Sequence, residues 1–311
     1  MRAVVFDGYG GPEVLRVVDL PVPEPGPGQV RVRVRAAGVN PVDVKRRRGD
    51  FAAFAPAGPP QATAPQRPSP QRLGNEYAGT VDALGSEVTG LAVGAEVLGS
   101  AGGDAYADFV VVPAADVVPR PPGAPVEVAG ALPAVGQTAH TALAAIGVGP
   151  GDTVLVHAAA GGVGTVAVQL ARLLGARVIG TASPANHEYV RGLGAIPVAY
   201  GPGLVERIRE LAPDGVDAAL DLVGGEAIAA SLALVADRRR IGTTVDARAA
   251  NEHGFQRVGA RSTPALVELV GLVASGGLVL PVDASYPLES APRAHARVEA
   301  GHVRGKLALT L

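Results

Sequence analysis

The segment His157–Gly164 reads HAAAGGVG and carries the clearest chemical signal in this chain. It follows an apolar run, Thr153–Val156, that is typical of a β-strand, and it opens a stretch with helical periodicity. A strand-to-helix turn that binds a diphosphate must be tight, must let the phosphates approach the main chain, and must pack its helix closely, so each demand excludes a side chain. Small residues at Ala159, Gly161 and Gly164 meet these demands, and the helix start adds free N–H groups and a positive dipole end. A tight turn without a ligand is the alternative. The expected diphosphate-binding residues are Ala159, Ala160, Gly161, Gly162, Val163 and Gly164.

The end of the next expected strand, 177–181, indicates which dinucleotide is bound. The chain there reads TASPANH (181–187), and the first acidic residue is Glu188. A carboxylate at this place would bind the ribose hydroxyls of NAD and repel a 2′-phosphate, whereas hydroxyl, amide and imidazole groups favour the phosphate. We therefore expect NADP(H), although Ser183 could merely cap the following helix and Arg191 could lie on its solvent face. The expected ligands at this strand end are Thr181, Ser183 and Asn186.

The composition excludes several other kinds of chemistry. The chain has no cysteine, so it has no thiol nucleophile, disulfide or thiolate ligand, and its six histidines are dispersed without the spacing of a metal site. The formal charge of −2 gives no reason to expect a nucleic-acid partner. No apolar stretch approaches the ~18 residues that span a bilayer, and the N-terminal residues alternate like a strand rather than a signal peptide. We expect a cytoplasmic protein that binds neither nucleic acid nor a membrane.

The elements that must position these residues fall into two parts, as 311 residues lead one to expect. The first part is mainly β and is punctuated by glycines, as in a small antiparallel barrel. Its expected strands are 2–6, 14–18, 30–36, 76–83, 95–98 and 106–112. After a PRPPG linker at 119–123, strands and helices alternate, which predicts a parallel sheet with right-handed crossovers. The expected strands there are 153–157, 177–181, 216–221 and 239–243, the helices 163–174, 203–212 and 225–236. Helices near 263–275 and 288–300 and a strand at 306–311 complete the chain.

Taken together, the motifs resemble the zinc-independent medium-chain dehydrogenases/reductases of the quinone oxidoreductase (zeta-crystallin-like) group. The segments that carry the resemblance are AAGVNPVDVKRRRG (36–49), GNEYAGTVDALGSEV (74–88), AYADFVVVPA (105–114), ALPAVGQTAHTAL (131–143), AAAGGVG (158–164), ALDLVGG (219–225) and GHVRGKLALTL (301–311). The resemblance implies an α/β fold, in which a doubly wound Rossmann sheet accompanies a GroES-like, mostly-β catalytic domain. It implies a first catalytic segment at 1–121, a Rossmann domain at 122–258 and a return segment at 259–311. It also implies a homodimer formed through the edge of the Rossmann sheet.

The zinc-binding branch of this superfamily differs at two positions. That branch has a cysteine after its Gly-Val pair and a histidine before the glutamate of Gly-His-Glu, where this chain has Asn40 and Asn75, with Glu76 retained. Amides are poor zinc ligands beside thiolate and imidazole. We expect no metal site.

Without a metal or thiol, the strong chemistry belongs to the nicotinamide. Hydride delivered to a quinone, or to the β-carbon of an α,β-unsaturated carbonyl compound, leaves negative charge on an oxygen that needs hydrogen-bond donors. By resemblance, Asn40 and Thr138 lie near the nicotinamide, where Asn40 would donate to that oxygen and Thr138 would help hold the ring or its ribose. Asn40 could instead only form a turn before Pro41, and Asp43 is expected to orient this loop.

One departure from the relatives concerns the proton. Related enoyl-thioester reductases and many quinone reductases have a tyrosine two residues after the glycine that corresponds to Gly49, whereas this chain has Phe51. The proton would then come from water or another side chain, such as Tyr77. This favours simple enone or quinone reduction over efficient enoyl-thioester reduction. The expected substrate-binding residues are Asn40, Phe51 and Tyr77.

Several segments of the sequence have more than one interpretation. Lys306 and His302, near the closing strand, could bind a cofactor phosphate, and Lys306 is included among the expected cofactor ligands. The run Lys45–Arg48 is expected to be a solvated helix face, or else to attract an anionic thioester. The unusual loop 54–72 motivates a second function, a secondary-metabolite tailoring enoyl reductase or cyclase. A third possible function, after the reductase and the tailoring enzyme, is that of a non-catalytic NADPH-binding protein.

Overall fold

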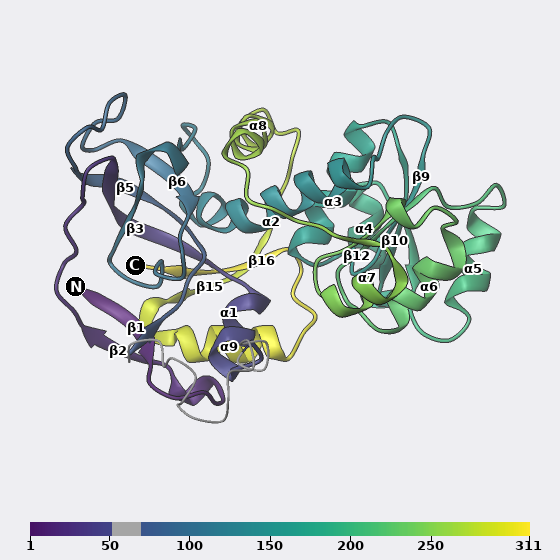
Figure 1. The fold of residues 1–311 in the computed structure, drawn as a ribbon, viewed down its shortest axis with the longest axis horizontal. Coiled ribbons are helices and arrows are strands. Elements are labelled where there is room, and N and C mark those ends of the chain that lie inside the picture. The colour runs from purple at the N-terminus through teal and green to yellow at the C-terminus, as the bar shows by residue number, and fades with distance from the viewer. Residues whose placement is uncertain (52–69) are drawn as a thin grey trace. The chain divides into compact units, whose positions relative to one another are not determined.

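The computed structural model describes residues 1–51 and 70–311, and these form two compact units (Figure 1). The first unit comprises Met1–Ala134 and Pro281–Leu311, and the second comprises Val135–Leu280. Most of the loop 54–72 lies outside the described residues; its last two form the short strand β4 (Gln71–Arg72).

The unit boundaries differ from the expected domain boundaries of 121 and 259. Helix α2 (Val126–Ala145) begins in the first unit, where Gly130 lies so close to β3 that an added Cβ would come within 2.7 Å of the Ala36 carbonyl oxygen. Residues 259–280, expected in the return segment, belong to the second unit. They are tied to the second half of α2, because Ala260 N donates to Thr141 Oγ1 at 2.8 Å and Ser262 N donates to Gln137 Oε1 at 2.6 Å.

A seven-stranded sheet forms the first unit, with strand order β15-β16-β3-β5-β6-β8 and β7 paired to β3. A three-stranded sheet of order β2-β1-β4 accompanies it. The further strands are β1 (Arg2–Phe6), β2 (Arg16–Asp19), β3 (Gln29–Val39), β5 (Glu76–Leu84), β6 (Glu96–Ser100), β7 (Phe109–Pro113), β8 (Val117–Pro119), β15 (Val282–Pro287) and β16 (Lys306–Thr310). The predicted alternation of residues 30–36 is confirmed, because Val30, Val32 and Val34 are buried in the core while the arginines between them are not.

Helix α1 (Pro41–Arg48) starts where β3 ends and lies beside α9 (Ala291–Glu299) in the first unit (Figure 1). Proline at its first position and Asn40 as its N-cap start the helix, and the Asp43 carboxylate accepts from the Asn40 N–H at 3.1 Å. Gly49, with φ of 85°, ends it. The strand β3 thus runs to residue 39 rather than 36 and delivers Asn40 directly to a helix start.

The second unit is a six-stranded parallel sheet of order β11-β10-β9-β12-β13-β14. Its strands are β9 (Thr153–Val156), β10 (Arg177–Ala182), β11 (Ile196–Ala199), β12 (Ala218–Asp221), β13 (Ile241–Thr243) and β14 (Gln256–Arg257). Its helices are α3 (Gly162–Leu173), α4 (His187–Leu193), α5 (Leu204–Leu211), α6 (Glu226–Leu234), α7 (Ala247–His253) and α8 (Thr263–Ala274). The chain winds from β9 to β11 in one direction and from β12 to β14 in the other, so right-handed crossovers place helices on both faces. The predicted α/β class with a doubly wound sheet is therefore confirmed, and the order reverses at β9, which leads into HAAAGGVG.

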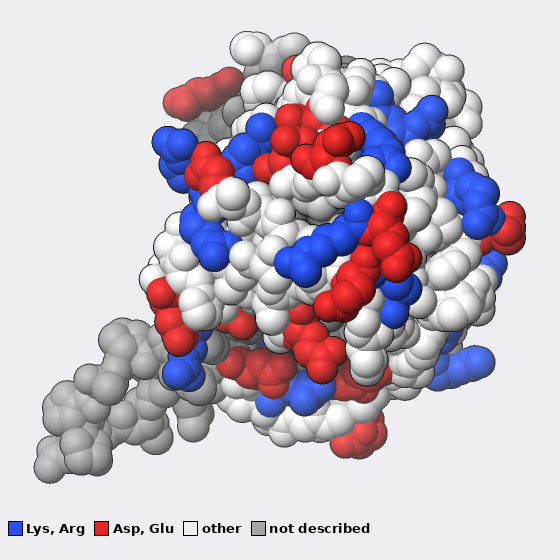
Figure 2. Space-filling model, turned by 90° about the vertical axis from the view of Figure 1, so that its right-hand side faces the viewer, with Lys and Arg blue, Asp and Glu red and all other residues white. Residues whose placement is uncertain are grey.

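The described surface carries both signs of charge. Figure 2 shows Lys and Arg side chains interspersed with Asp and Glu on one face, without a continuous basic area among the described residues visible there. None of the helices within 1–51 and 70–311 has both the length and the apolar character required to cross a membrane.

Candidate functional site

The glycine-rich turn between β9 and α3 is held in place by β10. Ala158 has a left-handed φ of 51°, its N–H donates to Thr181 Oγ1 at 3.1 Å, and Ala159 N donates to Thr181 O at 2.9 Å. Gly161 N closes the turn on Ala158 O at 3.0 Å. Thr181, which we expected to bind the cofactor, is buried and shapes the turn through both its oxygens.

Two positions of this turn have glycine for different reasons. A Cβ on Gly164 would lie 2.7 Å from Ala159 Cα and still closer to Ala158 O, so the packing of α3 against the turn requires glycine there. Gly161 has an ordinary φ of −76°, and a Cβ on it would meet only Ala158 O, at 3.4 Å. Neither the backbone nor the protein's own atoms require glycine at 161, so the open space suits a group from outside the chain.

The N-terminus of α3 completes an anion site. Its N-cap is Gly161, without a side-chain cap, and its first turn is Gly162, Val163 and Gly164. The first N–H groups of a helix have no carbonyl partner within it, and the dipole places positive charge at this end. Ala159 and Ala160, within the turn, are buried. The residues present therefore fit the diphosphate of a dinucleotide.

The end of β10 brings Ser183 and Asn186 together. Asn186 Nδ2 donates to Ser183 Oγ at 3.3 Å, and Ser183 makes no side-chain cap to the short 3-10 helix that follows it. Glu188, the first acid after the strand, is exposed and forms an ion pair with Arg191. The strand end thus holds a half-buried hydroxyl and a buried amide that bond to each other, while Arg191 is exposed on α4 and paired with Glu188.

A buried polar cluster, which the sequence did not lead us to expect, lies at the end of β9, where the turn begins. His157 Nε2 lies 3.0 Å from Ser231 Oγ, and Ser231 donates its own hydrogen to Ala227 O at 2.9 Å, so His157 is the donor in this pair. Burial lowers the pKa of His157 to about 4, and the neighbouring Asp221 carboxylate opposes this. The sequence contains only part of this signal: His157 ends one expected strand, 153–157, and Asp221 ends another, 216–221, and it is the order of the sheet that places the two strands side by side.

Asp221 joins β12 to β13 at their carboxyl ends. Its carboxylate is fully buried and accepts from Thr243 Oγ1 at 2.6 Å and from the N–H groups of Val223 and Gly224, both at 2.9 Å. His157 N donates to Leu220 O at 3.0 Å. The cluster therefore joins β9, β12 and β13 at the strand ends from which the turn begins.

Thr138 lies on α2 within the second unit and is half-buried. A Cβ on Gly259 would lie 2.9 Å from its methyl group, so the segment after β14 packs directly on this threonine. Asn40 belongs to the first unit.

Asn40 lies in a buried polar network of the first unit. Its Nδ2 donates to Glu76 Oε1 at 2.7 Å, and its Oδ1 accepts from Lys306 Nζ at 2.6 Å. Lys306 Nζ also donates to Glu76 Oε1 at 2.9 Å and to Val39 O at 3.0 Å. Glu76 Oε2 accepts from Ala134 N at 2.6 Å, where α2 passes its internal proline, Pro133.

The expectation that Lys306 binds a cofactor phosphate is wrong for this structure. The side chain is 3% exposed, and its three ammonium hydrogens have three oxygen partners inside the first unit. The physical reason is the pairing of β16 with β3, which sets Leu307 opposite Val39 and brings Lys306 beside Asn40. Local sequence patterns contain no information about this pairing.

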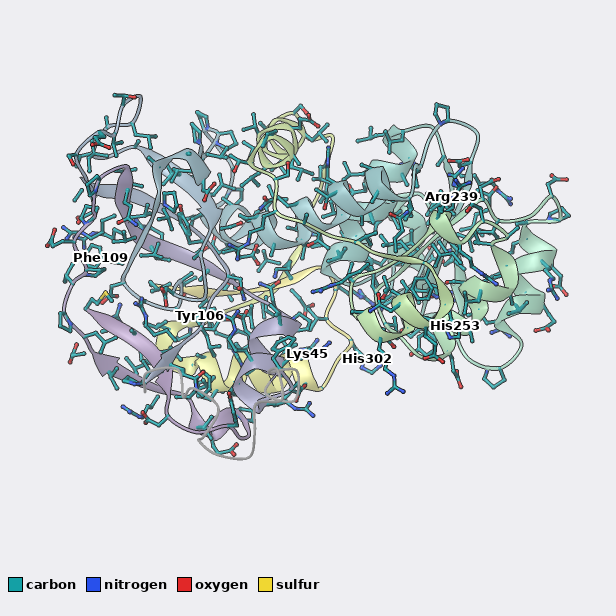
Figure 3. All side chains as sticks on the ribbon, in the orientation of Figure 1. Lys45, Tyr106, Phe109, Arg239, His253 and His302 are labelled. Atoms are coloured by element: carbon teal, nitrogen blue, oxygen red, sulfur yellow. The ribbon has the colours of Figure 1, made fainter. Side chains whose placement is uncertain are left out.

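Asp43 orients the Asn40 loop, as expected. Its buried carboxylate accepts from four donors, the N–H groups of Asn40 and Gly74, the Asn75 amide at 2.7 Å and the Tyr106 hydroxyl at 3.2 Å. Burial raises the pKa of Asp43 to about 6, although these hydrogen bonds and nearby cations act in the opposite direction. Figure 3 shows Tyr106 in the interior of the first unit, whereas Lys45 extends from α1.

Of the two aromatic residues expected at the substrate, Phe51 is 46% exposed and follows the end of α1. Tyr77 is fully buried in the core of the first unit, and burial raises the pKa of its hydroxyl. A buried phenol next to Gly99 in an apolar core does not reach a substrate, so the expectation for Tyr77 is corrected.

The basic run of α1 is not a uniformly solvated face. Arg47 is fully buried and forms an ion pair with Glu299 of α9, while Arg48 is exposed.

Within the part of the chain that the structure describes, no group of three or more His, Cys, Asp or Glu residues could hold a metal ion.

Comparison with known proteins places these features in a family. Residues 26–125 match the alcohol dehydrogenase GroES-like domain, and residues 193–309 match the zinc-binding dehydrogenase family. The quinone oxidoreductase of Pseudomonas aeruginosa is 33% identical over 335 aligned positions that cover 99% of both chains. The erythronolide synthase EryA2 of Saccharopolyspora erythraea is 38% identical over 78% of this chain, but this chain spans only 5–12% of the length of the polyketide synthases it matches first.

Solved structures agree with this placement. The quinone oxidoreductase of Coxiella burnetii has a TM-score of 0.87 and 33% identity, over 100% of this chain and 99% of that one. The Escherichia coli quinone oxidoreductase in complex with NADPH has a TM-score of 0.86 and 29% identity, over 100% of both chains. This chain therefore belongs to the quinone oxidoreductase group of the zinc-independent medium-chain dehydrogenases/reductases.

Proposed function

We propose that this protein is an NADPH-dependent reductase that transfers hydride, without a metal, to a quinone or to the activated C=C bond of an α,β-unsaturated carbonyl compound. The observation that carries the proposal is the open main chain at Gly161, where the protein itself does not require glycine. Bound NADPH would supply the hydride, and the chain would bind the cofactor, exclude water and stabilise charge on the acceptor.

The cofactor would be held by the turn and by the end of β10. The main chain of Ala159–Gly164 would bind the diphosphate, Ser183 and Asn186 would donate to the 2′-phosphate, and Thr138 would hold the nicotinamide ring or its ribose. The Escherichia coli relative was solved with NADPH, which supports this choice of cofactor.

Calorimetry with NADPH and NADH tests the cofactor assignment. We expect NADPH to bind at least about tenfold more tightly, because charge-assisted hydrogen bonds contribute ~1.5–3 kcal/mol each. Ser183→Asp places a carboxylate against the 2′-phosphate and should reverse the preference, while Ser183→Ala should only weaken it. Equal affinities in the wild-type protein would contradict NADPH dependence.

The acceptor would be reduced beside Asn40. Hydride adds to the β-carbon of an enone, the oxygen takes up negative charge, and water delivers the proton, because Phe51 has no hydroxyl and Tyr77 is buried. NADPH oxidation in the presence of quinones and enones tests this step. Turnover supports the proposal, whereas tight NADPH binding without turnover on any acceptor would support a non-catalytic binding protein.

A second candidate is an enoyl-thioester reductase or a tailoring enzyme of secondary metabolism. It is favoured by the 36–38% identity with polyketide synthases. It is disfavoured by Phe51, which cannot donate a proton. A crotonyl thioester compared with 1,4-naphthoquinone separates the two: a higher kcat/KM on the thioester would favour the second candidate.

A further inference from the structure

One of the two lysines in this chain is buried. Lys45 lies on α1 and is half-buried, whereas Lys306 begins β16 and is 3% exposed. Charged lysines are almost never fully buried unless they are paired. Strand pairing places Lys306 but does not explain how its charge is stabilised in the interior.

Three oxygens surround the ammonium of Lys306. Asn40 Oδ1 lies at 2.6 Å, Glu76 Oε1 at 2.9 Å and Val39 O at 3.0 Å, so each ammonium hydrogen has its own acceptor. The close approach of the carboxylate depends on Gly38, because a Cβ there would lie 2.6 Å from Glu76 Cδ. The chain thus lacks a side chain at residue 38, where one would collide with this carboxylate.

The ammonium and the carboxylate together fix the orientation of the Asn40 amide. Lys306 can only donate and an ionised Glu76 can only accept, so Oδ1 must face Lys306 and Nδ2 must face Glu76. If the amide were flipped, Nδ2 would face the ammonium of Lys306 and Oδ1 would face the carboxylate of Glu76. Donor would then meet donor, and acceptor would meet acceptor. One Nδ2 hydrogen is used by Glu76 at 2.7 Å, and the other makes only a long contact, 3.4 Å, to Gly38 O.

We propose that Lys306 is a positioning residue of the reductase: as a fixed cation it locks the Asn40 amide so that the second Nδ2 hydrogen is held ready for the oxygen of the acceptor. This inference rests on the proposed function, in which Asn40 stabilises that oxygen. The alternative is that Lys306 serves only as the counter-ion of Glu76, without influence on Asn40.

The network itself can be observed without any assay of activity. The protein is labelled with nitrogen-15 at lysine Nζ, and the Lys45→Arg variant leaves Lys306 as the only labelled ammonium. We expect a sharp, slowly exchanging ammonium signal from Lys306, and its loss in Asn40→Ala or on unfolding. A rapidly exchanging signal in the folded protein would overturn the buried network.

The positioning role is tested with charge-balanced variants. Lys306→Met alone leaves a buried carboxylate without its cation and is expected to unfold easily. Lys306→Met combined with Glu76→Gln removes both charges and keeps similar volumes, but the introduced glutamine amide can bond to either end of the Asn40 amide. We expect this double variant to keep its NADPH Kd within about twofold and to lose kcat with 1,4-naphthoquinone by at least about tenfold, since loss of an oxyanion donor costs ~10²–10³ in kcat.

The outcomes separate the alternatives. A folded double variant with wild-type kcat would show that Lys306 is only a counter-ion and would overturn the proposal, as would equal losses in kcat and NADPH affinity. Arg240→Met is the matched control, because it removes an ion pair with Asp152, 2.6 Å long, in the second unit and should change kcat by less than about twofold. Failure of the wild-type protein to bind NADPH would overturn the proposed function, and with it the positioning role, while a slowly exchanging Lys306 signal would then still be seen.

Discussion

Gly161 and Gly164 lie three residues apart in the same turn, yet substitution by alanine should affect stability very differently at the two positions. Gly161→Ala should change the free energy of unfolding by less than about 0.5 kcal/mol, because φ is ordinary and the nearest atom to the new Cβ is 3.4 Å away. Gly164→Ala should destabilise the protein by ~1–3 kcal/mol, because its Cβ would lie 2.7 Å from Ala159 Cα.

Affinity for NADPH then distinguishes the two positions from a purely structural turn. If the diphosphate occupies the space over Gly161, Gly161→Ala should raise the Kd for NADPH at least about tenfold in a protein of unchanged stability. Urea unfolding and calorimetry on the same preparations provide both measurements. A Gly161→Ala protein with wild-type NADPH affinity would show that the open space is not the cofactor site.

Asp43 predicts an unusual pH dependence of stability. Burial raises the pKa of this carboxyl from 3.8 to about 6 in the folded protein, so the folded state binds its proton more tightly than the unfolded state. The contribution of Asp43 is therefore fully present below pH 3.8 and is lost as the pH rises through about 6. A shift of about two pKa units corresponds to ~3 kcal/mol.

Unfolding by urea between pH 4 and pH 7 measures this contribution. Relative to Asp43→Asn, the wild-type protein should lose ~3 kcal/mol of stability across this range. The comparison with the variant cancels the effect of the other titrating groups, among them His157. Because the pKa of His157 is lowered to about 4, its contribution to stability is present above pH 6.5 and is lost as the pH falls through about 4. Parallel pH profiles for the two proteins would mean that Asp43 does not titrate in this window.

Strand β10 supports the turn through one hydroxyl, which makes Thr181 the test at the level of elements. Thr181→Val keeps the side-chain shape but removes the acceptor of the Ala158 N–H, which is 3.1 Å away. We expect a loss of ~1 kcal/mol in stability and a several-fold rise in the Kd for NADPH. In the variant, Ala158 would have to keep its left-handed φ of 51° without the hydrogen bond that supports it in the wild-type protein. Thr310→Val, whose hydroxyl makes a 3.4 Å contact to Tyr286 O in the first unit, is the matched control and should leave the NADPH Kd unchanged.

The elements also show what the sequence can and cannot predict. The turn at 157–164 was predictable because a strand, small residues and a helix follow one another within a few positions. The valines of β3 were predictable for the same reason, since alternation is a local pattern. The network of Asn40, Glu76 and Lys306 was not, because Lys306 lies 266 residues from Asn40 and reaches it only through the pairing of β16 with β3. A glutamate and a lysine that look ordinary in the sequence are both buried and form an ion pair 2.9 Å long.

At the scale of the molecule, the boundary between the compact units falls inside a helix rather than in a linker. The PRPPG segment at 119–123 has the composition of a linker, but the division comes after Ala134, within the continuous helix α2. Pro133 lacks an N–H and interrupts the hydrogen bonds of that helix, and Glu76 accepts from the next N–H, that of Ala134. Composition marks where a chain is irregular, whereas contacts decide where a unit ends.

The edge of the second sheet carries the last prediction, a homodimer. Strand β14 is an edge strand, and Val258 N donates to Thr243 O of β13, so the alternation of a strand directs the Arg257 N–H away from the sheet. We propose that two copies pair through this edge, which predicts a mass of twice 31.1 kDa by light scattering. Arg257→Pro removes the outward N–H together with the arginine side chain and should yield a monomer that keeps its NADPH affinity. A wild-type monomer, or a dimeric Arg257→Pro protein, would exclude β14 as the interface, since an edge strand without its outward donor has lost the hydrogen bond that the pairing requires.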